Sequence, residues 1–219
     1  MTSSLPRRPI CPRCLRPAAT CLCDLVVALP HDTEVLVLQH PQEQRQAKNS
    51  VGLLRLSLQR CEVAVGESFE PAALQALLHR PGRVSRLLYP DVPSAPAPVA
   101  APPAAGEATR LVVIDATWRK SLKMLLLHPA LQALPRLALQ APEPTRYRAI
   151  RAARRDDQVS TLEATVQALR QLEAPGWDGA PLLQAFGRFV GREAARHQRG
   201  AAAGEFGGEV GGAPQAGQS

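Results

Sequence analysis

The chain has 219 residues, which suits one domain with an ordinary hydrophobic core and a small appended segment. Its formal net charge of +7 favours an anionic partner such as RNA, although an arginine-rich composition can also reflect genomic bias. No run of about 18 apolar residues occurs, so we expect no membrane-spanning helix, and the first residues lack the apolar region of a secretory signal. We therefore expect a cytoplasmic protein.

Four cysteines stand close together near the N-terminus: Cys11, Cys14, Cys21 and Cys23. The spacing Cys-x2-Cys-x6-Cys-x-Cys offers enough thiolates for one closed tetrahedral Zn²⁺ site. The segment shows no apolar periodicity, so a metal rather than a core would order it. Two disulfides are the alternative if the protein is exported. We expect a zinc-binding knuckle over residues 10–24, and we expect Cys61, in a strand-like run, to be a buried apolar residue.

Strand and helix signals alternate in the next part of the chain. Runs of β-branched and other apolar residues predict strands at 33–39, 61–65, 85–89, 111–114 and 136–139. Apolar residues at helical spacing predict helices at 48–58, 72–79, 118–127, 160–172 and 181–198. Strands separated by helices imply an α/β fold with a mainly parallel sheet and helices on both faces.

Two segments have a different composition. Residues 91–108 are rich in Pro and Ala, can hardly pack, and are predicted to form an exposed insertion. Residues 200–219 are rich in Gly and Ala and are predicted to be a disordered tail. The main domain is therefore expected to cover residues 25–199.

An acidic residue, Asp115, directly follows the apolar run 111–114 and precedes the helix expected from Trp118. A carboxylate at the carboxyl end of a buried strand lies where open α/β sheets bind their ligands. The same position also suits an ordinary helix cap. The chain has no Gly-x-Gly-x-x-Gly motif, so it lacks the glycine-rich turn of a common dinucleotide-binding fold.

In this context the sequence Asp115-Ala116-Thr117-Trp118 resembles the signature of the DTW-domain family. Three further motifs follow the family's order: the cysteine knuckle, then His40-Pro41-Gln42-Glu43 with Asn49-Ser50-Val51-Gly52, then Tyr147-Arg148-Ala149-Ile150-Arg151 leading into Ser160-Thr161-Leu162-Glu163. Ser50 stands where the family usually has Thr. The resemblance spans about residues 11–190.

The resemblance implies a tRNA-uridine aminocarboxypropyltransferase. Such an enzyme transfers the 3-amino-3-carboxypropyl group of S-adenosylmethionine to N3 of a tRNA uridine, in bacterial members within the variable loop. It also implies a SPOUT-like fold in which the C-terminal part forms a trefoil knot around the cofactor. The alternatives are a SPOUT methyltransferase that uses S-adenosylmethionine on RNA and a non-catalytic, zinc-containing RNA-binding protein. The sequence does not determine the oligomeric state.

The resemblance also assigns roles to individual residues. The expected catalytic residues are Asp115, Thr117 and Trp118, with Asp115 as the base for the N3 proton or as an orienting group. The expected cofactor-binding residues are Leu88, Tyr89, Asp115, Trp118, Ser160, Thr161 and Glu163, although Ser160 and Glu163 also fit a capping box. The expected contacts to RNA phosphates are Arg119, Lys120, Lys123, Arg146, Arg148 and Arg151. The roles of His40 and Glu43 stay open.

Overall fold

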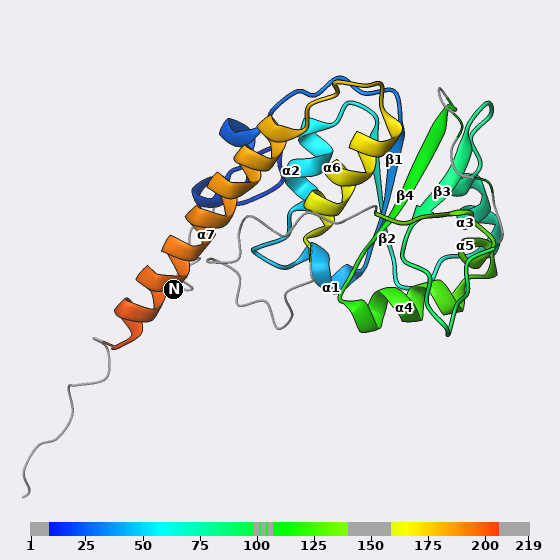
Figure 1. Cartoon of the computed structure of the whole chain (residues 1–219). Coiled ribbons are helices and arrows are strands. Elements are labelled where there is room, and N and C mark those ends of the chain that lie inside the picture. Colours follow the sequence, from blue (N-terminus) through cyan, green and yellow to red (C-terminus); the bar gives the residue numbers. More distant parts are fainter. Residues whose placement is uncertain (1–8, 99–100, 102–103, 105–106, 140–158, 206–219) are drawn as a thin grey trace, which may run out of the picture.

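A computed structural model of the chain describes residues 9–98, 101, 104, 107–139 and 159–205. Its centre is a five-stranded sheet in the order β2-β1-β4-β3-β5, in which every pair of neighbours is parallel (Figure 1). The strands are β1 (Glu34–Gln39), β2 (Cys61–Val65), β3 (Val84–Leu88), β4 (Thr109–Asp115) and β5 (Arg136–Leu137). The parallel α/β sheet expected from the alternating pattern is confirmed.

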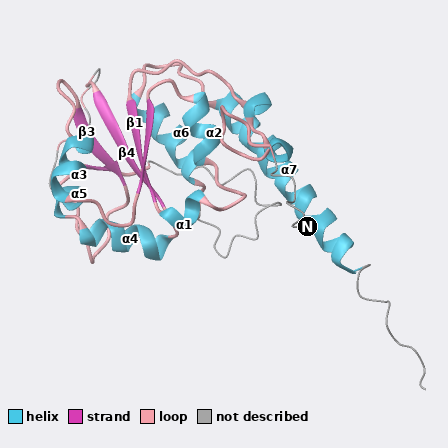
Figure 2. Cartoon of the chain, turned by 180° about the vertical axis from the view of Figure 1, so that it is seen from behind, coloured by secondary structure: helices cyan, strands magenta, loops and turns pink. Residues whose placement is uncertain are grey.

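Helices cover both faces of this sheet, because successive side chains of each strand point to opposite sides. Val35 and Val37 of β1 belong to one hydrophobic cluster, and Leu36 and Leu38 belong to the other. The first cluster includes side chains of α2 (Val51–Ser57), α6 (Thr161–Leu172) and α7 (Ala180–Glu205). The second includes side chains of α3 (Pro71–Leu78), α4 (Trp118–Leu127) and α5 (Pro129–Gln132). Figure 2 shows these two layers from behind.

The two central strands lead to helices on opposite faces. After β1 the chain passes through the short α1 (Pro41–Gln44) to α2 on the first face, whereas after β4 it enters α4 on the second face. The register places Gln39 beside Asp115 at the same end of the sheet. This end is therefore a topological switch point, the place where open α/β sheets bind ligands.

Strand β4 begins two residues before the predicted start because a buried arginine extends it. Arg110 is only 1% exposed. Its guanidinium donates to Glu34 at 2.7 Å and to Glu62 at 2.6 Å, and also to the carbonyl oxygen of Leu77 at 3.0 Å. These partners compensate the buried charge, which a prediction from hydrophobicity alone would exclude from a strand.

The Pro/Ala-rich segment 91–108 is not wholly exposed, so that prediction was wrong in part. Ala95 is buried in the second cluster and pairs with Val92 in an isolated bridge. At the end of the segment, Glu107 accepts a hydrogen bond of 2.8 Å from Nε of the buried Arg86. The small Ala side chain and this ion pair allow a proline-rich segment to lie against the sheet.

The last helix, α7, continues to Glu205, beyond the end predicted at residue 198. Its extension contains Ala201, Ala202 and Ala203, and Ala has the highest helix propensity. The predicted tail is therefore helical over its first residues, and residues 206–219 lie outside the described part. In Figure 1 the C-terminal turns of α7 extend away from the sheet. None of the helices described combines the length and apolar character needed to cross a membrane.

Candidate active site and metal centre

Asp115 ends β4 and is held by side chains from three other segments. Its Oδ1 accepts a hydrogen bond of 2.6 Å from Oγ1 of Thr161. Its Oδ2 accepts from Nε2 of Gln39 at 2.8 Å and from Nδ2 of Asn49 at 3.0 Å. Thr117, not Asp115, is the N-cap residue of α4, so the interpretation of Asp115 as a cap of this helix is wrong. The carboxylate instead joins β1, the loop before α2 and the start of α6.

Each partner of Asp115 is positioned by its own local structure. Gln39 is the last residue of β1 and lies opposite Asp115 in the sheet. Asn49 accepts a hydrogen bond of 3.0 Å at Oδ1 from the backbone N–H of Val51, which orients its amide at the start of α2. The roles of Gln39 and Asn49 were not predicted from the sequence. Asn49 lies in one of the quoted motifs, whereas the only signal for Gln39 is a polar residue at the end of an apolar strand.

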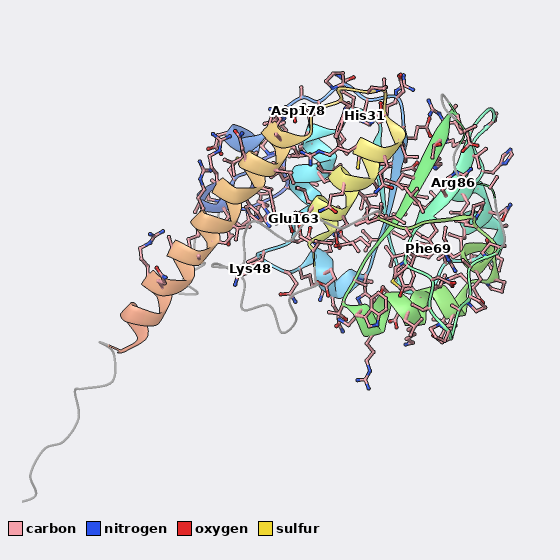
Figure 3. The ribbon with its side chains drawn as sticks, in the orientation of Figure 1. His31, Lys48, Phe69, Arg86, Glu163 and Asp178 are labelled. Atoms are coloured by element: carbon pink, nitrogen blue, oxygen red, sulfur yellow. The ribbon has the colours of Figure 1, made fainter. Side chains whose placement is uncertain are left out.

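Ser160 and Glu163 form the capping box that was the alternative to cofactor binding. The Ser160 hydroxyl accepts from the Glu163 backbone N–H at 3.2 Å, and the Glu163 carboxylate accepts from the Ser160 backbone N–H at 2.9 Å. Figure 3 labels Glu163 at this end of α6. The box orders the first turn of α6 and so places the Thr161 hydroxyl on Asp115.

Trp118, three residues after Asp115 in the chain, belongs to an aromatic pair. The rings of Tyr89 and Trp118 are stacked with centroids 5.4 Å apart and an interplanar angle of 12°. Tyr89 follows β3 and is buried, and its hydroxyl lies 3.1 Å from Oγ of Ser121. Burial raises the pKa of Tyr89, so its phenol stays neutral near pH 7. Trp118 is 51% exposed, which leaves an indole surface open to a ligand, and Leu88 lies half-buried beside Tyr89.

The three predicted basic residues of α4 differ in their surroundings. Lys120 donates to Gln42 at 2.5 Å and lies 3.7 Å from a carboxylate oxygen of Glu43. Lys123 donates to Glu67 at 2.5 Å. Arg119 is exposed and has no ion-pair partner among the described residues. Arg146, Arg148 and Arg151 lie outside the described residues.

His40 lies between the start of α1 and the carboxylate of Glu67. Its Nδ1 accepts from the backbone N–H of Gln42 and so caps α1, and its Nε2 lies 3.5 Å from a carboxylate oxygen of Glu67. Because Nδ1 accepts this hydrogen bond, Nε2 is the nitrogen that can donate, and it faces Glu67. His40 thereby connects the end of β1 to the carboxylate that also binds Lys123.

The four N-terminal cysteines converge on one point. Their Sγ atoms all lie within 4.8 Å of one another, and the pairs Cys11–Cys23 and Cys14–Cys21 are each separated by 3.7 Å. A tetrahedral site with Zn–S bonds of about 2.3 Å has sulfur atoms about 3.8 Å apart, whereas a disulfide needs about 2.05 Å. The arrangement therefore fits one tetrahedral metal ion, and all four residues are free cysteines.

The thiols of the cluster influence one another's ionisation because they lie so close together. The backbone N–H groups of Cys14 and Arg13 lower the pKa of Cys11 to about 6. Burial and the neighbouring thiols raise the pKa of Cys23 to about 12. Four thiolates this close to one another need a cation to compensate their charge. Cys61 lies apart from them and packs against the core, and burial raises its pKa to about 12, so it is no nucleophile.

The knuckle is also ordered by the core, contrary to the expectation that metal alone would order it. Leu22 is 2% exposed and belongs to the first cluster. The guanidinium of Arg16 lies 5.1 Å from the ring centroid of Phe189 in α7. The same guanidinium donates to the carbonyl oxygens of Ala47 at 2.7 Å and Asn49 at 3.4 Å. The knuckle thus contacts the loop that contains Asn49, a hydrogen-bond donor to Asp115.

Comparisons with known proteins agree with the motifs. The model of the DTW domain matches residues 8–193. A "tRNA-uridine aminocarboxypropyltransferase 2" of Drosophila melanogaster is 35% identical over 77% of this chain and 68% of its own length. A protein of the same name from Macaca fascicularis is 28% identical over 81% of the chain and 61% of its own length.

A plant relative extends the comparison. "tRNA-uridine aminocarboxypropyltransferase A" of Arabidopsis thaliana is 32% identical over 54% of this chain and 51% of its own length. The chain therefore spans between about half and two thirds of the length of these curated relatives. No solved structure matches it significantly.

Proposed function

Because this chain belongs to the DTW-domain family, we propose that it is a tRNA-uridine aminocarboxypropyltransferase. The observation that carries the proposal is the Asp115 carboxylate, oriented by three donors at the switch point of the sheet and followed closely in the chain by the exposed Trp118. A positioned carboxylate beside an open aromatic surface suits proton removal from a flat, neutral base.

In the proposed reaction S-adenosylmethionine supplies the 3-amino-3-carboxypropyl group and methylthioadenosine leaves. A bond forms between N3 of the uridine and Cγ of the donor, the Cγ–S bond breaks with its electron pair staying on sulfur, and the N3 proton passes to Asp115. A carboxylate offers about four lone-pair positions, and Gln39, Asn49 and Thr161 occupy three of them. One position is left for the N3 proton.

The remaining residues of the site would bind and orient the donor and the uracil. Trp118 and Tyr89 offer an aromatic wall for the methionine chain of the donor or for the uracil. Leu88 precedes Tyr89 but packs against the first cluster, on the other face of the sheet. Thr117 is the N-cap residue of α4 and directly precedes Trp118. Ser160 and Glu163 act on the donor through the position of Thr161. No proton donor is needed for the leaving thioether, so most of the rate gain would come from the alignment of Cγ with N3.

The substrate RNA would be held mainly through its phosphates. Arg119 is the described basic residue of α4 whose charge is available, while Lys120 and Lys123 would have to exchange their protein partners for phosphates. We propose the same role for Arg146, Arg148 and Arg151. In the sequence they lie between β5 and α6, and the first residue of α6, Thr161, donates a hydrogen bond to Asp115.

Two structural expectations also belong to this proposal. Cys11, Cys14, Cys21 and Cys23 would bind one structural Zn²⁺, which the separation of their sulfur atoms supports. The fold would be SPOUT-like with a C-terminal trefoil knot.

Incubation of the purified protein with S-adenosylmethionine and unmodified tRNA tests the function. We expect methylthioadenosine in the supernatant and, in the digested tRNA, a uridine whose mass has increased by one aminocarboxypropyl group. Release of S-adenosylhomocysteine with a methylated nucleoside would instead show a methyltransferase. Binding of tRNA without either product, in a protein that also binds the donor, would contradict the enzymatic proposal.

A further inference from the structure

Arg136 is a half-buried cation with two buried nitrogens whose hydrogen bonds are not satisfied within the described part of the chain. It is the first residue of β5, at the edge of the sheet next to Leu87. Its Nε and Nη2 are inaccessible to solvent and have no hydrogen-bond partner among the described residues. Only Nη1 makes a hydrogen bond, of 3.3 Å, to the carbonyl oxygen of Leu131. Buried polar groups are nearly always paired, so two free donors on one charged group need an explanation.

The two free nitrogens have a specific geometry. Nε and Nη2 share one edge of the planar guanidinium, and this edge forms two parallel hydrogen bonds with a carboxylate or a phosphate. Asp91 and the Tyr89 hydroxyl act on Arg136 only through longer-range electrostatics, and burial lowers the pKa of Arg136. In the described part of the chain the group therefore has a free binding edge and no anion bound to it.

Arg136 also lies next to the aromatic pair. Its guanidinium carbon is 5.9 Å from the ring centroid of Tyr89, which stacks on Trp118. Asp115 comes three residues before Trp118 in the chain, and the guanidinium of Arg136 lies near Tyr89, the other ring of the pair. The side chain is flexible and stands on an edge strand, so a change of rotamer can turn its edge toward a ligand without moving the sheet.

On the basis of the proposed function, we propose that Arg136 binds the carboxylate of the donor's aminocarboxypropyl group. This carboxylate remains on the transferred group throughout the reaction. Binding of this carboxylate beside Tyr89 would fix one end of the aminocarboxypropyl group that carries Cγ. The ring of Trp118 would contact the middle of the same group. An RNA phosphate shares the oxyanion chemistry, but the position of Arg136 near the buried Tyr89 favours a small ligand.

Two ligands that differ in this group test the proposal by calorimetry. S-Adenosylhomocysteine carries the amino acid carboxylate, whereas methylthioadenosine lacks the whole amino acid part. We expect Arg136→Met to weaken binding of S-adenosylhomocysteine about tenfold or more and to leave binding of methylthioadenosine within about twofold. Arg136→Lys keeps the positive charge but cannot form two parallel hydrogen bonds, so it should lose less affinity for S-adenosylhomocysteine than Arg136→Met. Arg60→Met, at an exposed turn, is the matched control and should change neither ligand.

The outcomes separate the possible sources of the anion. Equal weakening of both ligands, or no change for either, would overturn the proposal. A variant that binds both ligands normally but binds tRNA more weakly, with a shallower dependence on salt, would assign Arg136 to a phosphate. If Arg136→Met does not fold, the same comparison is made with Arg136→Lys. These are binding measurements, so a wild-type protein that fails to modify tRNA contradicts the proposed function without deciding the role of Arg136.

Discussion

Asn49 donates a hydrogen bond of 3.0 Å from Nδ2 to Oδ2 of Asp115, across 66 positions of the chain. Because its Oδ1 accepts from the backbone of Val51, the amide is fixed at both ends. We expect Asn49→Ala to lower kcat about tenfold to hundredfold, since a hydrogen bond to a charged group contributes about 1.5–3 kcal/mol. Steady-state kinetics with tRNA measure the effect. An unchanged kcat would show that Asn49 only shapes the start of α2.

Replacement of Asn49 by Asp tests the same contact through its charge. Asn49→Asp would bring a second carboxylate to within about 3 Å of Asp115, and two like charges at this distance favour one shared proton. We expect the acidic limb of the pH–rate profile to move to higher pH, because the pair must lose this proton before Asp115 can act as the base. Asn49→Ala is the control: it removes one donor from the carboxylate without adding a charge, so its limb should move less than that of Asn49→Asp. Identical pH–rate profiles for the wild type, Asn49→Asp and Asn49→Ala would show that Asp115 does not take part in the proton transfer.

Asp115→Asn separates basicity from shape. The new amide can donate to the Thr161 hydroxyl and accept from Gln39 and Asn49, so the hydrogen bonds of the site can persist and the fold should remain. Turnover should fall by roughly 10²–10⁴, the usual contribution of a positioned general base. Single-turnover assays measure the rate, and circular dichroism and calorimetry check folding and donor binding. A folded variant that still modifies tRNA at nearly the wild-type rate would leave Asp115 a positioning residue.

The cysteine cluster predicts about one equivalent of zinc in the purified protein. Cys14→Ser should lose it. Leu22 and Leu25 also anchor the knuckle in the core, so we expect local rather than global unfolding. Hydrogen exchange should increase in the knuckle and, through the contacts of Arg16, in residues 47–49. Cys61→Ser is the control and should keep its zinc. A wild-type protein that is fully active without metal would contradict the prediction.

The ion pair between Glu107 and Arg86 should make stability depend on pH. The hydrogen bond from Arg86 holds the pKa of Glu107 below its ordinary value of 4.5. A carboxyl whose pKa is lowered by folding stabilises the protein above its ordinary pKa, and this stabilisation is lost as the pH falls through the lowered value. Removal of one partner of a buried pair costs about 3 kcal/mol, and Glu107→Gln should cost less because its amide oxygen can still accept from Arg86.

Urea unfolding at neutral and at acidic pH measures this effect. The difference between the wild type and Glu107→Gln should be largest near neutral pH and should shrink as Glu107 becomes protonated. A difference that stays constant over this range would show that packing of the 91–108 segment, and not charge, accounts for the loss.

The basic residues of α4 should contribute unequally to tRNA binding. Arg119→Ala should weaken binding at moderate salt and reduce the slope of log K against log salt by about 1, because one phosphate contact is lost. Lys123→Ala should have a smaller effect, since the charge of Lys123 is already compensated by Glu67. Filter binding over a range of salt concentrations compares the two. Equal effects would show that Lys123 leaves Glu67 when RNA binds.

The sequence alone predicted features that depend on neighbouring residues. The alternation of apolar runs and helical periodicity identified the parallel sheet, since side-chain periods of 2 and 3.6 follow directly from backbone geometry. Closely spaced cysteines likewise predicted a metal cluster, because four thiols within one short loop can hardly avoid one another. The signature at Asp115 predicted the carboxylate at the end of a strand.

Contacts between distant parts of the chain were decided only by the tertiary structure. Nothing local indicates that Gln39, Asn49 and Thr161 share one carboxylate, because their meeting depends on the order β2-β1-β4-β3-β5. Arg110 within a strand and Arg136 beside Tyr89 could not be predicted either, since a pattern of hydrophobicity assigns charged residues to the surface. The buried charge of Arg110 is tolerated because partners from other segments compensate it, and the three-dimensional packing alone determines which segments these are.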